Sequence, residues 1–138
     1  MVCPSFQPQA VYPVGEFPVH IAAADFDNDG FIDLAVVNIG SNDVSILLNN
    51  GCGVFTEAPG SPVSMGLGIL TSDITAADFN GSGSIDLAVV NEANNTVSIL
   101  LNNGSAMFTP APGSPFPTGT NPLSIVAADF DGNGSVDL

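Results

Sequence analysis

Short apolar runs, each followed by polar or glycine-rich residues, succeed one another along the chain. In the first half they cover residues 21–26, 34–38 and 44–48, with a shorter run around Phe55. Val, Ile and Leu dominate these runs, and none has the 3.6-residue period of an amphipathic helix. The pattern predicts four short β-strands and no helix of useful length. Asn50-Gly51 between the last two runs predicts a type I′ hairpin turn.

The whole pattern is repeated. Residues 74–116 align with residues 21–63 at an offset of 53 without a gap. A second set of strands is therefore expected at residues 74–79, 87–91, 97–101 and around Phe108. A third copy begins with an expected strand at residues 125–130. The chain divides into residues 1–20 as the C-terminal part of a preceding repeat, 21–73 as repeat 1, 74–124 as repeat 2 and 125–138 as the start of repeat 3.

A unit of about 50 residues with four strands has the size of one β-propeller blade. A closed propeller needs about four to eight blades, whereas this chain holds two complete units and two partial ones. The expected fold is all-β, with four-stranded antiparallel propeller-type blades in a larger propeller or in an oligomeric or fibrous assembly. The expected partners are other copies of the chain or the rest of a longer repeat chain.

The charge of the chain is entirely negative at neutral pH. Its 138 residues include 14 acidic side chains and no Lys or Arg. Nucleic acid is therefore excluded as a partner, because nothing could neutralise its phosphates. Nine of the 14 acids lie within residues 25–33, 78–86 and 129–137, and clustered acids without bases favour a cation site. No apolar window is long enough to span a membrane, and no signal peptide is visible.

Residues 25–33 have the spacing of a cation-binding loop. Oxygen donors at positions 1, 3, 5, 7 (a backbone carbonyl) and 9 come from Asp25, Asp27, Asp29, Phe31 and Asp33. Gly30 permits the sharp turn. Such hard donors suit Ca²⁺, which takes about 6–8 oxygens, better than Mg²⁺, and a loop without Cys or His does not suit zinc. An EF-hand would need a Glu at position 12 and a following helix, but here an apolar strand follows.

The other two copies of the loop carry fewer carboxylates. The second offers Asp78, Asn80, Ser82, the Ser84 carbonyl and Asp86. The third offers Asp129, Asp131, Asn133, the Ser135 carbonyl and Asp137. The three loops have four, two and three carboxylates, so the chain is expected to bind up to three Ca²⁺ ions. Because ligand charge tunes affinity, the first site is expected to be the tightest and the second the weakest.

The string Ala-Asp-Phe-Asp-x-Asp-Gly-x-x-Asp-Leu-Ala-Val-Val-Asn at residues 24–38 resembles the FG-GAP/VCBS repeat, the blade of integrin-α-like β-propellers. The resemblance covers nearly the whole chain. It implies Ca²⁺ bound between the first two strands of a blade by residues such as Asp25, Asp27, Asp29 and Asp33. It also implies seven blades as a rule and an extracellular or cell-surface location. Ser82 and an Ala-Pro-Gly-Ser-Pro string in place of the literal FG-GAP letters depart from the family pattern.

The expected function is that of a calcium-binding extracellular repeat protein with a structural or adhesive role, within a larger propeller or a fibre. The alternatives are a carbohydrate-binding, lectin-like module and an accessory domain of a secreted enzyme. The chain offers sugars few aromatic platforms, because it has no Trp and only one Tyr, Tyr12. No nucleophile, base and oxyanion donors occur together, so we assign no catalytic residue and do not expect an enzyme.

Several other residues allow more than one interpretation. His20 occupies the place of Asp73 and Ser124 in the other repeats, and is expected to be structural or exposed. Cys3 and Cys52 lie at equivalent places of successive units, and are expected to be free thiols or to pair with another chain. Asn-x-Ser/Thr sequons, which permit glycosylation but also arise by chance, occur at Asn80, Asn94, Asn103 and Asn133.

Overall fold

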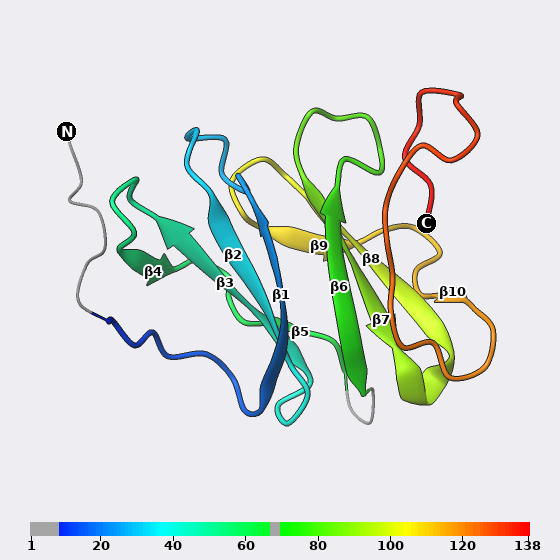
Figure 1. The fold of residues 1–138 in the computed structure, drawn as a ribbon, viewed down its shortest axis with the longest axis horizontal. Helices are drawn as coiled ribbons and strands as arrows, with labels where there is room; N and C mark the ends of the chain where they lie inside the picture. Colours follow the sequence, from blue (N-terminus) through cyan, green and yellow to red (C-terminus); the bar gives the residue numbers. More distant parts are fainter. Residues whose placement is uncertain (1–8, 67–69) are drawn as a thin grey trace.

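The computed structural model describes residues 9–66 and 70–138, which form two antiparallel β-sheets standing side by side (Figure 1). The first sheet contains β1 (Pro18–Ala24), β2 (Asp33–Asn38), β3 (Asp43–Asn49), β4 (Phe55–Glu57) and β5 (Val63–Ser64). The second contains β6 (Thr71–Ala77), β7 (Asp86–Asn91), β8 (Thr96–Asn102), β9 (Phe108–Pro110) and β10 (Phe116–Pro117), with a 3₁₀ turn, η1 (Glu92–Asn94), between β7 and β8. The all-β prediction is confirmed. Each sheet has the form of a propeller-type blade, and the two do not close into a ring.

Each sheet is a meander whose outermost strand is split in two. The order is β1-β2-β3 with both β4 and β5 paired to β3, and β6-β7-β8 with both β9 and β10 paired to β8. The sequence predicted one short fourth strand per unit and missed β5 and β10. Between the two halves, Ser61 Oγ accepts a hydrogen bond from the Ile46 N–H at 2.9 Å, and Ser114 Oγ accepts one from Ile99 in the same way. A serine side chain thus replaces one backbone partner of the inner strand.

Two local predictions are wrong. The Asn50-Gly51 pair does not form a two-residue turn, because five residues separate β3 from β4 and the Asn50 N–H donates to the carbonyl of Val54 at 3.1 Å. The expected strand at 125–130 is reduced to a single bridge between Ala128 and Asp137. Within residues 9–66 and 70–138, no strand pairs with this segment apart from the bridge.

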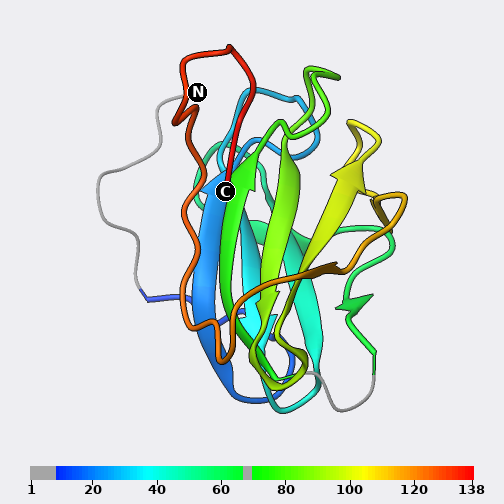
Figure 2. The ribbon, with the colours of Figure 1, turned by 90° about the vertical axis from the view of Figure 1, so that its right-hand side faces the viewer.

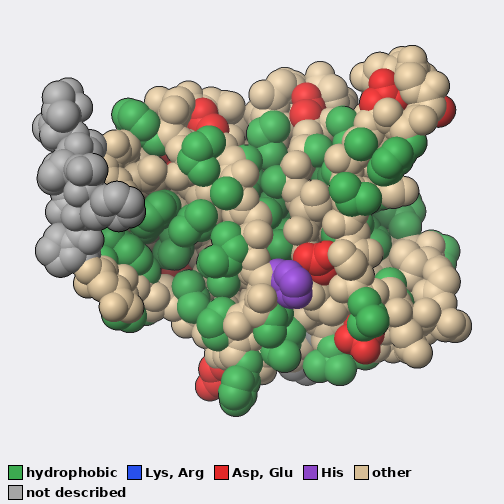
Figure 3. Space-filling model, in the orientation of Figure 1, with side chains coloured by type: hydrophobic (Ala, Val, Ile, Leu, Met, Phe, Trp, Pro, Cys, Tyr) green, Lys and Arg blue, Asp and Glu red, His purple; other side chains and the backbone are tan. Residues whose placement is uncertain are grey.

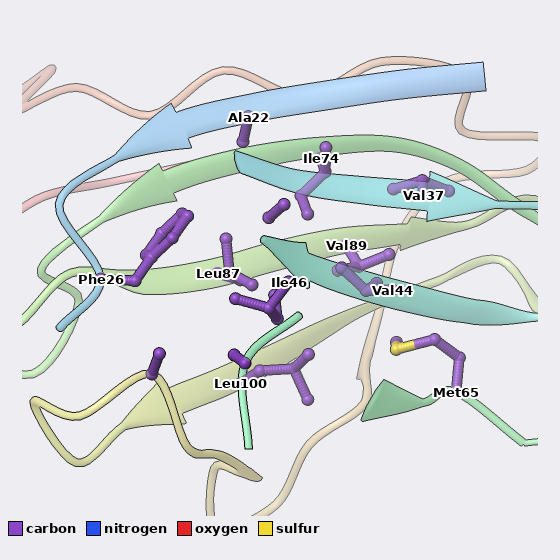
Figure 4. Close-up of a cluster of buried hydrophobic side chains, with 13 residues drawn as sticks. Ala22, Phe26, Val37, Val44, Ile46, Met65, Ile74, Leu87, Val89 and Leu100 are labelled. Atoms are coloured by element: carbon purple, nitrogen blue, oxygen red, sulfur yellow. The ribbon is translucent and has the colours of Figure 1, made fainter. Parts of the chain in front are cut away.

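The main core lies between the two sheets. Side chains alternate across each strand, so that Leu87 and Val89 face the first sheet while Ala88 and Val90 belong to a second cluster on the opposite face. Figure 4 shows the interlocking side chains of the main core. Its buried members are Ala22, Phe26, Ala35, Val37, Val44, Ile46, Ala58, Met65, Ile74, Leu87, Val89, Leu100 and Ala106. Burial on both faces explains why β7 reads as a continuous apolar run.

Equivalent residues of three repeats meet beside the first strands of the sheets. Asp73 accepts hydrogen bonds from Ser124 Oγ at 2.7 Å and from the Ile125 N–H at 3.0 Å, and His20 Nδ1 lies 3.2 Å from its carboxylate. Figure 3 shows the histidine beside an acidic side chain on this face. β1 and β6 lie next to each other in both views (Figures 1 and 2). Asp73, the last residue of repeat 1, therefore contacts the end of the preceding repeat, the end of repeat 2 and the start of repeat 3.

Replacing Asp73 with Ala is expected to destabilise the protein by about 1.5–3 kcal/mol at neutral pH, the usual contribution of hydrogen bonds to a charged group. Desolvation alone would raise the pKa of Asp73, but hydrogen bonds from Ser124, Ile125 and Ile74 outweigh it and lower that pKa below its ordinary value. A carboxyl with a lowered folded pKa stabilises the fold above its unfolded pKa of about 4, and that contribution is lost as pH falls through the folded value.

Urea unfolding of wild type and Asp73→Ala at neutral and strongly acidic pH tests this expectation. The two stabilities should differ at neutral pH and converge as pH falls from about 4, the ordinary aspartate value, through the lower folded pKa of Asp73. An equal difference at both pH values would show that the carboxylate charge does not hold the repeats together.

No helix in the described part of the chain has the length and apolar character needed to cross a membrane.

Candidate metal site

The three acidic loops lie along one edge of the molecule. The first two loops follow β1 and β6, and the third follows the bridge residue Ala128. All three project at the top of Figure 1. Figure 3 shows acidic side chains at each of these three projections and no basic side chain near them. The repeat of the sequence thus becomes a row of candidate sites.

In the first loop, three carboxylates converge. Oxygens of Asp25, Asp27 and Asp29 lie within 4.8 Å of one another. The loop is closed by backbone N–H groups that donate to these side chains, with Gly30 donating to Asp25 Oδ2 at 2.9 Å and Asp29 donating to Asp27 Oδ1 at 3.2 Å. Gly30 has a φ of 89°, a conformation that glycine adopts without steric cost. The loop therefore turns tightly around its own acidic side chains.

Asp33, the fourth predicted carboxylate, is fully buried and is not one of the three carboxylates that lie within 4.8 Å of one another. Its two oxygens accept hydrogen bonds from the N–H of Phe26 at 2.9 Å and from the N–H of Asn49 at 2.8 Å. Asp33 thus ties the two ends of the loop to β3. Each carboxylate oxygen has two lone pairs, so these hydrogen bonds leave acceptor capacity for an ion. The N–H of Phe31, the predicted carbonyl ligand, donates to Asp29 Oδ1 at 2.8 Å.

The pKa of Asp27 is raised above its ordinary value. Desolvation is the largest cause and the negative charges of Asp29, Asp33 and Asp25 add to it, so that together they outweigh a hydrogen bond from the Asp29 N–H. No Lys or Arg exists in the chain to relieve this repulsion. A divalent cation would relieve it, and a set of carboxylate oxygens in a tight loop fits Ca²⁺.

The second loop has the same backbone with fewer charges. Asp78 accepts hydrogen bonds from Gly83 at 2.8 Å and from Ser82 at 3.0 Å, and the former lowers its pKa most. Asn80 Oδ1 accepts a hydrogen bond from Ser82 N–H at 2.8 Å, and the N–H of Ser84 donates to Ser82 Oγ at 3.3 Å. The buried Asp86 takes the place of Asp33.

The third loop brings together Asp129, Asp131 and Asp137, whose oxygens also lie within 4.8 Å of one another. Hydrogen bonds from the backbone, above all from Gly134, lower the pKa of Asp129. Asn133 Oδ1 accepts the Ser135 N–H at 2.7 Å. Phe130, the counterpart of Phe26, is 63% exposed here.

Sequence reasoning missed the contacts that the first loop makes with the second sheet. The carbonyl of Phe26 accepts hydrogen bonds from Asn102 Nδ2 at 2.8 Å and from the Ala106 N–H at 3.0 Å. Asn28 Nδ2 donates to the Gly104 carbonyl at 3.2 Å. The sequence shows only that Asn49 and Asn102 occupy equivalent positions, each at the end of the third strand of its unit. It does not indicate that Asn102 contacts the first loop.

Two other residues singled out from the sequence, Tyr12 and Cys52, have defined surroundings. Tyr12 packs edge-on against Phe55 and donates a hydrogen bond to the Gly53 carbonyl at 3.0 Å, so that this ring is engaged within the protein. Cys52 is disulfide-bonded, which corrects the expectation of a free thiol there. Cys3 lies outside the described residues.

One comparison with known proteins gives a match. A family model described as FG-GAP-like repeat matches residues 25–89 and 78–138, which together include all three acidic loops. Repeats of this family often bind calcium and are typically extracellular. No match was found among the curated proteins or the solved structures with which the chain was compared.

Proposed function

Because the chain belongs to the FG-GAP-like repeat family, we propose that it is a calcium-binding extracellular repeat protein with a structural or adhesive role. The observation that carries this proposal is the convergence of Asp25, Asp27 and Asp29 within 4.8 Å in a chain without Lys or Arg. Bound calcium would supply the positive charge that these carboxylates lack. The side chains would hold the loop in one conformation and so stiffen the junction of β1 and β2.

The three loops are expected to differ in affinity. Loop 25–33 should bind calcium most tightly, loop 129–137 next and loop 78–86 least, in the order of their carboxylates. Asp29→Ala should therefore cost more calcium affinity than Ser82→Ala, because only the first change removes a charge from position 5. Titration calorimetry of both single variants tests this order, and a larger loss for Ser82→Ala would show that charge count does not set the affinity.

We further propose that the face of the second sheet opposite the main core receives another repeat of the same kind, from a second copy or from a longer chain. The buried residues of this face are Ala88, Val90, Val97 and Ile99. Their equivalents in the first sheet belong to the main core, where they pack against the second sheet. Residues 116–138 cover this face incompletely, leaving a hollow of about 420 Å³ between Phe79, Ile99 and Leu138.

Sedimentation velocity at increasing protein concentration tests the assembly. The sedimentation coefficient should rise with concentration, and Leu138→Asp should weaken this rise because it places a charge in the apolar hollow. Val11, which is 86% exposed, gives the control Val11→Asp. A coefficient that stays at the value of a single chain over the whole range would contradict association between copies.

A further inference from the structure

The first acidic loop is held by the second sheet as well as by its own. Phe26 lies between Asp25 and Asp27, and it is fully buried in the core between the sheets (Figure 4). Its ring meets Phe108 edge-on, with the ring centroids 5.7 Å apart. Its carbonyl oxygen accepts the hydrogen bonds from Asn102 Nδ2 and the Ala106 N–H described above. The backbone that carries two of the converging carboxylates is thus fixed from both sides.

Asn102 contacts both neighbouring loops at once. Its side-chain amide donates to the carbonyl of Phe26 in the first loop and to the carbonyl of Ile85 in the second, at 2.8 and 3.0 Å. Its backbone N–H donates to Asp86 Oδ1 at 2.8 Å. One residue at the end of β8 therefore joins the two loops and the two sheets.

The equivalent residue of the first sheet has only the local half of this role. Asn49 donates its backbone N–H to Asp33 and its side-chain amide to the Ile32 carbonyl at 3.0 Å. Within residues 9–66 and 70–138, the Asn49 amide has no partner corresponding to Phe26. The bond between Asn102 and Phe26 is therefore a product of sheet packing and is not needed to form the turn at the end of the strand.

We propose that Asn102 is a positioning residue that couples calcium binding in loop 25–33 to the docking of the second sheet on the first. The inference rests on the proposed calcium function. By fixing the Phe26 carbonyl, Asn102 holds Asp25 and Asp27 near the arrangement that an ion requires, so less conformational freedom is lost on binding. Coupling of this kind is reciprocal, so the bound ion also strengthens the hold of Phe26 on the second sheet.

The experiment is a calcium titration followed by NMR of two backbone amides. Gly30 and Gly83 donate to Asp25 Oδ2 and Asp78 Oδ2, at 2.9 and 2.8 Å, and so report the first and second loops separately. Asn102→Ala should weaken the affinity reported by Gly30 by on the order of tenfold, the low end of losses caused by removing an outer-shell partner. A purely local role of Asn102 would affect Gly83 and leave Gly30 unchanged. Asn103→Ala, beside it in the exposed turn, is the control and should leave Gly30 unchanged.

Hydrogen exchange of the wild-type protein gives a second readout that needs no variant. Calcium should slow exchange of the Ala106 amide, whose hydrogen bond ends on the Phe26 carbonyl. If Gly30 reports calcium binding but the exchange rate of the Ala106 amide does not change, the coupling is overturned. The same holds if Asn102→Ala leaves the calcium affinity reported by Gly30 unchanged. In both cases the proposed calcium function stands. A wild-type protein whose Gly30 and Gly83 signals do not respond to calcium would overturn the proposed function, and this inference with it.

Discussion

Calcium is expected to raise the melting temperature of the ion-free protein, and a chelator is expected to lower it again. An ion that binds only the folded state stabilises it by about 2.7 kcal/mol per site at a hundredfold excess over Kd. Magnesium should restore the melting temperature poorly, because it prefers fewer protein ligands and a stricter geometry. Calorimetric melts in EDTA, in calcium and in magnesium measure all three states. A melting temperature that is the same in EDTA and in calcium would contradict the site assignment.

The calcium effect should shrink in acid. In the ion-free protein the raised pKa of Asp27 means that the folded state holds a proton more tightly than the unfolded state does. Its contribution to stability therefore falls as pH rises through the range between the ordinary pKa and the raised one. Because calcium competes with that proton, its stabilisation should be largest at neutral pH and should weaken as Asp27 becomes protonated. A calcium effect that grows as pH falls would contradict the repulsion inferred at the first loop.

Replacing Phe26 with Ala is expected to cost about 3–5 kcal/mol, the usual loss when a buried aromatic ring is removed from a core. The ring fills space between the sheets and packs on Phe108, so its loss should loosen their contact. Urea unfolding in EDTA measures this packing effect without any contribution from bound ions.

Phe130 provides a matched control, because it has the same position in the third loop and is 63% exposed. Phe130→Ala should change stability by no more than about 0.5 kcal/mol, as expected for a surface substitution. Equal losses in the two variants would show that Phe26 acts through the loop itself and not through the contact between the sheets.

The repeat could be predicted from sequence because its signals are local. Apolar runs of strand length and the Asp25-x-Asp27-x-Asp29-Gly30 spacing are written in consecutive residues, and each copy reinforces the others. The first strand ends earlier than predicted, because the acidic loop begins inside the apolar run from which the strand was predicted. β1 ends at Ala24, since the N–H of Phe26 is given to the Asp33 side chain and not to a neighbouring strand.

What the sequence did not reveal depends on contacts between distant residues. Phe26 and Phe130 follow the same Ala-Asp pair, yet one is buried and the other exposed, because only the first loop has a complete sheet beside it. The contact between Phe26 and Asn102 joins positions 76 residues apart. β5 contains only two residues, too few for periodicity to detect.

The most direct test of calcium binding by the acidic loops is a crystal structure grown in calcium, with anomalous difference density collected to identify the ion. We expect a peak inside loop 25–33, in contact with Asp25, Asp27 and Asp29 and at oxygen distances of about 2.3–2.6 Å. A well-ordered loop without such a peak, at a calcium concentration that saturates the protein in solution, would contradict calcium binding by this loop.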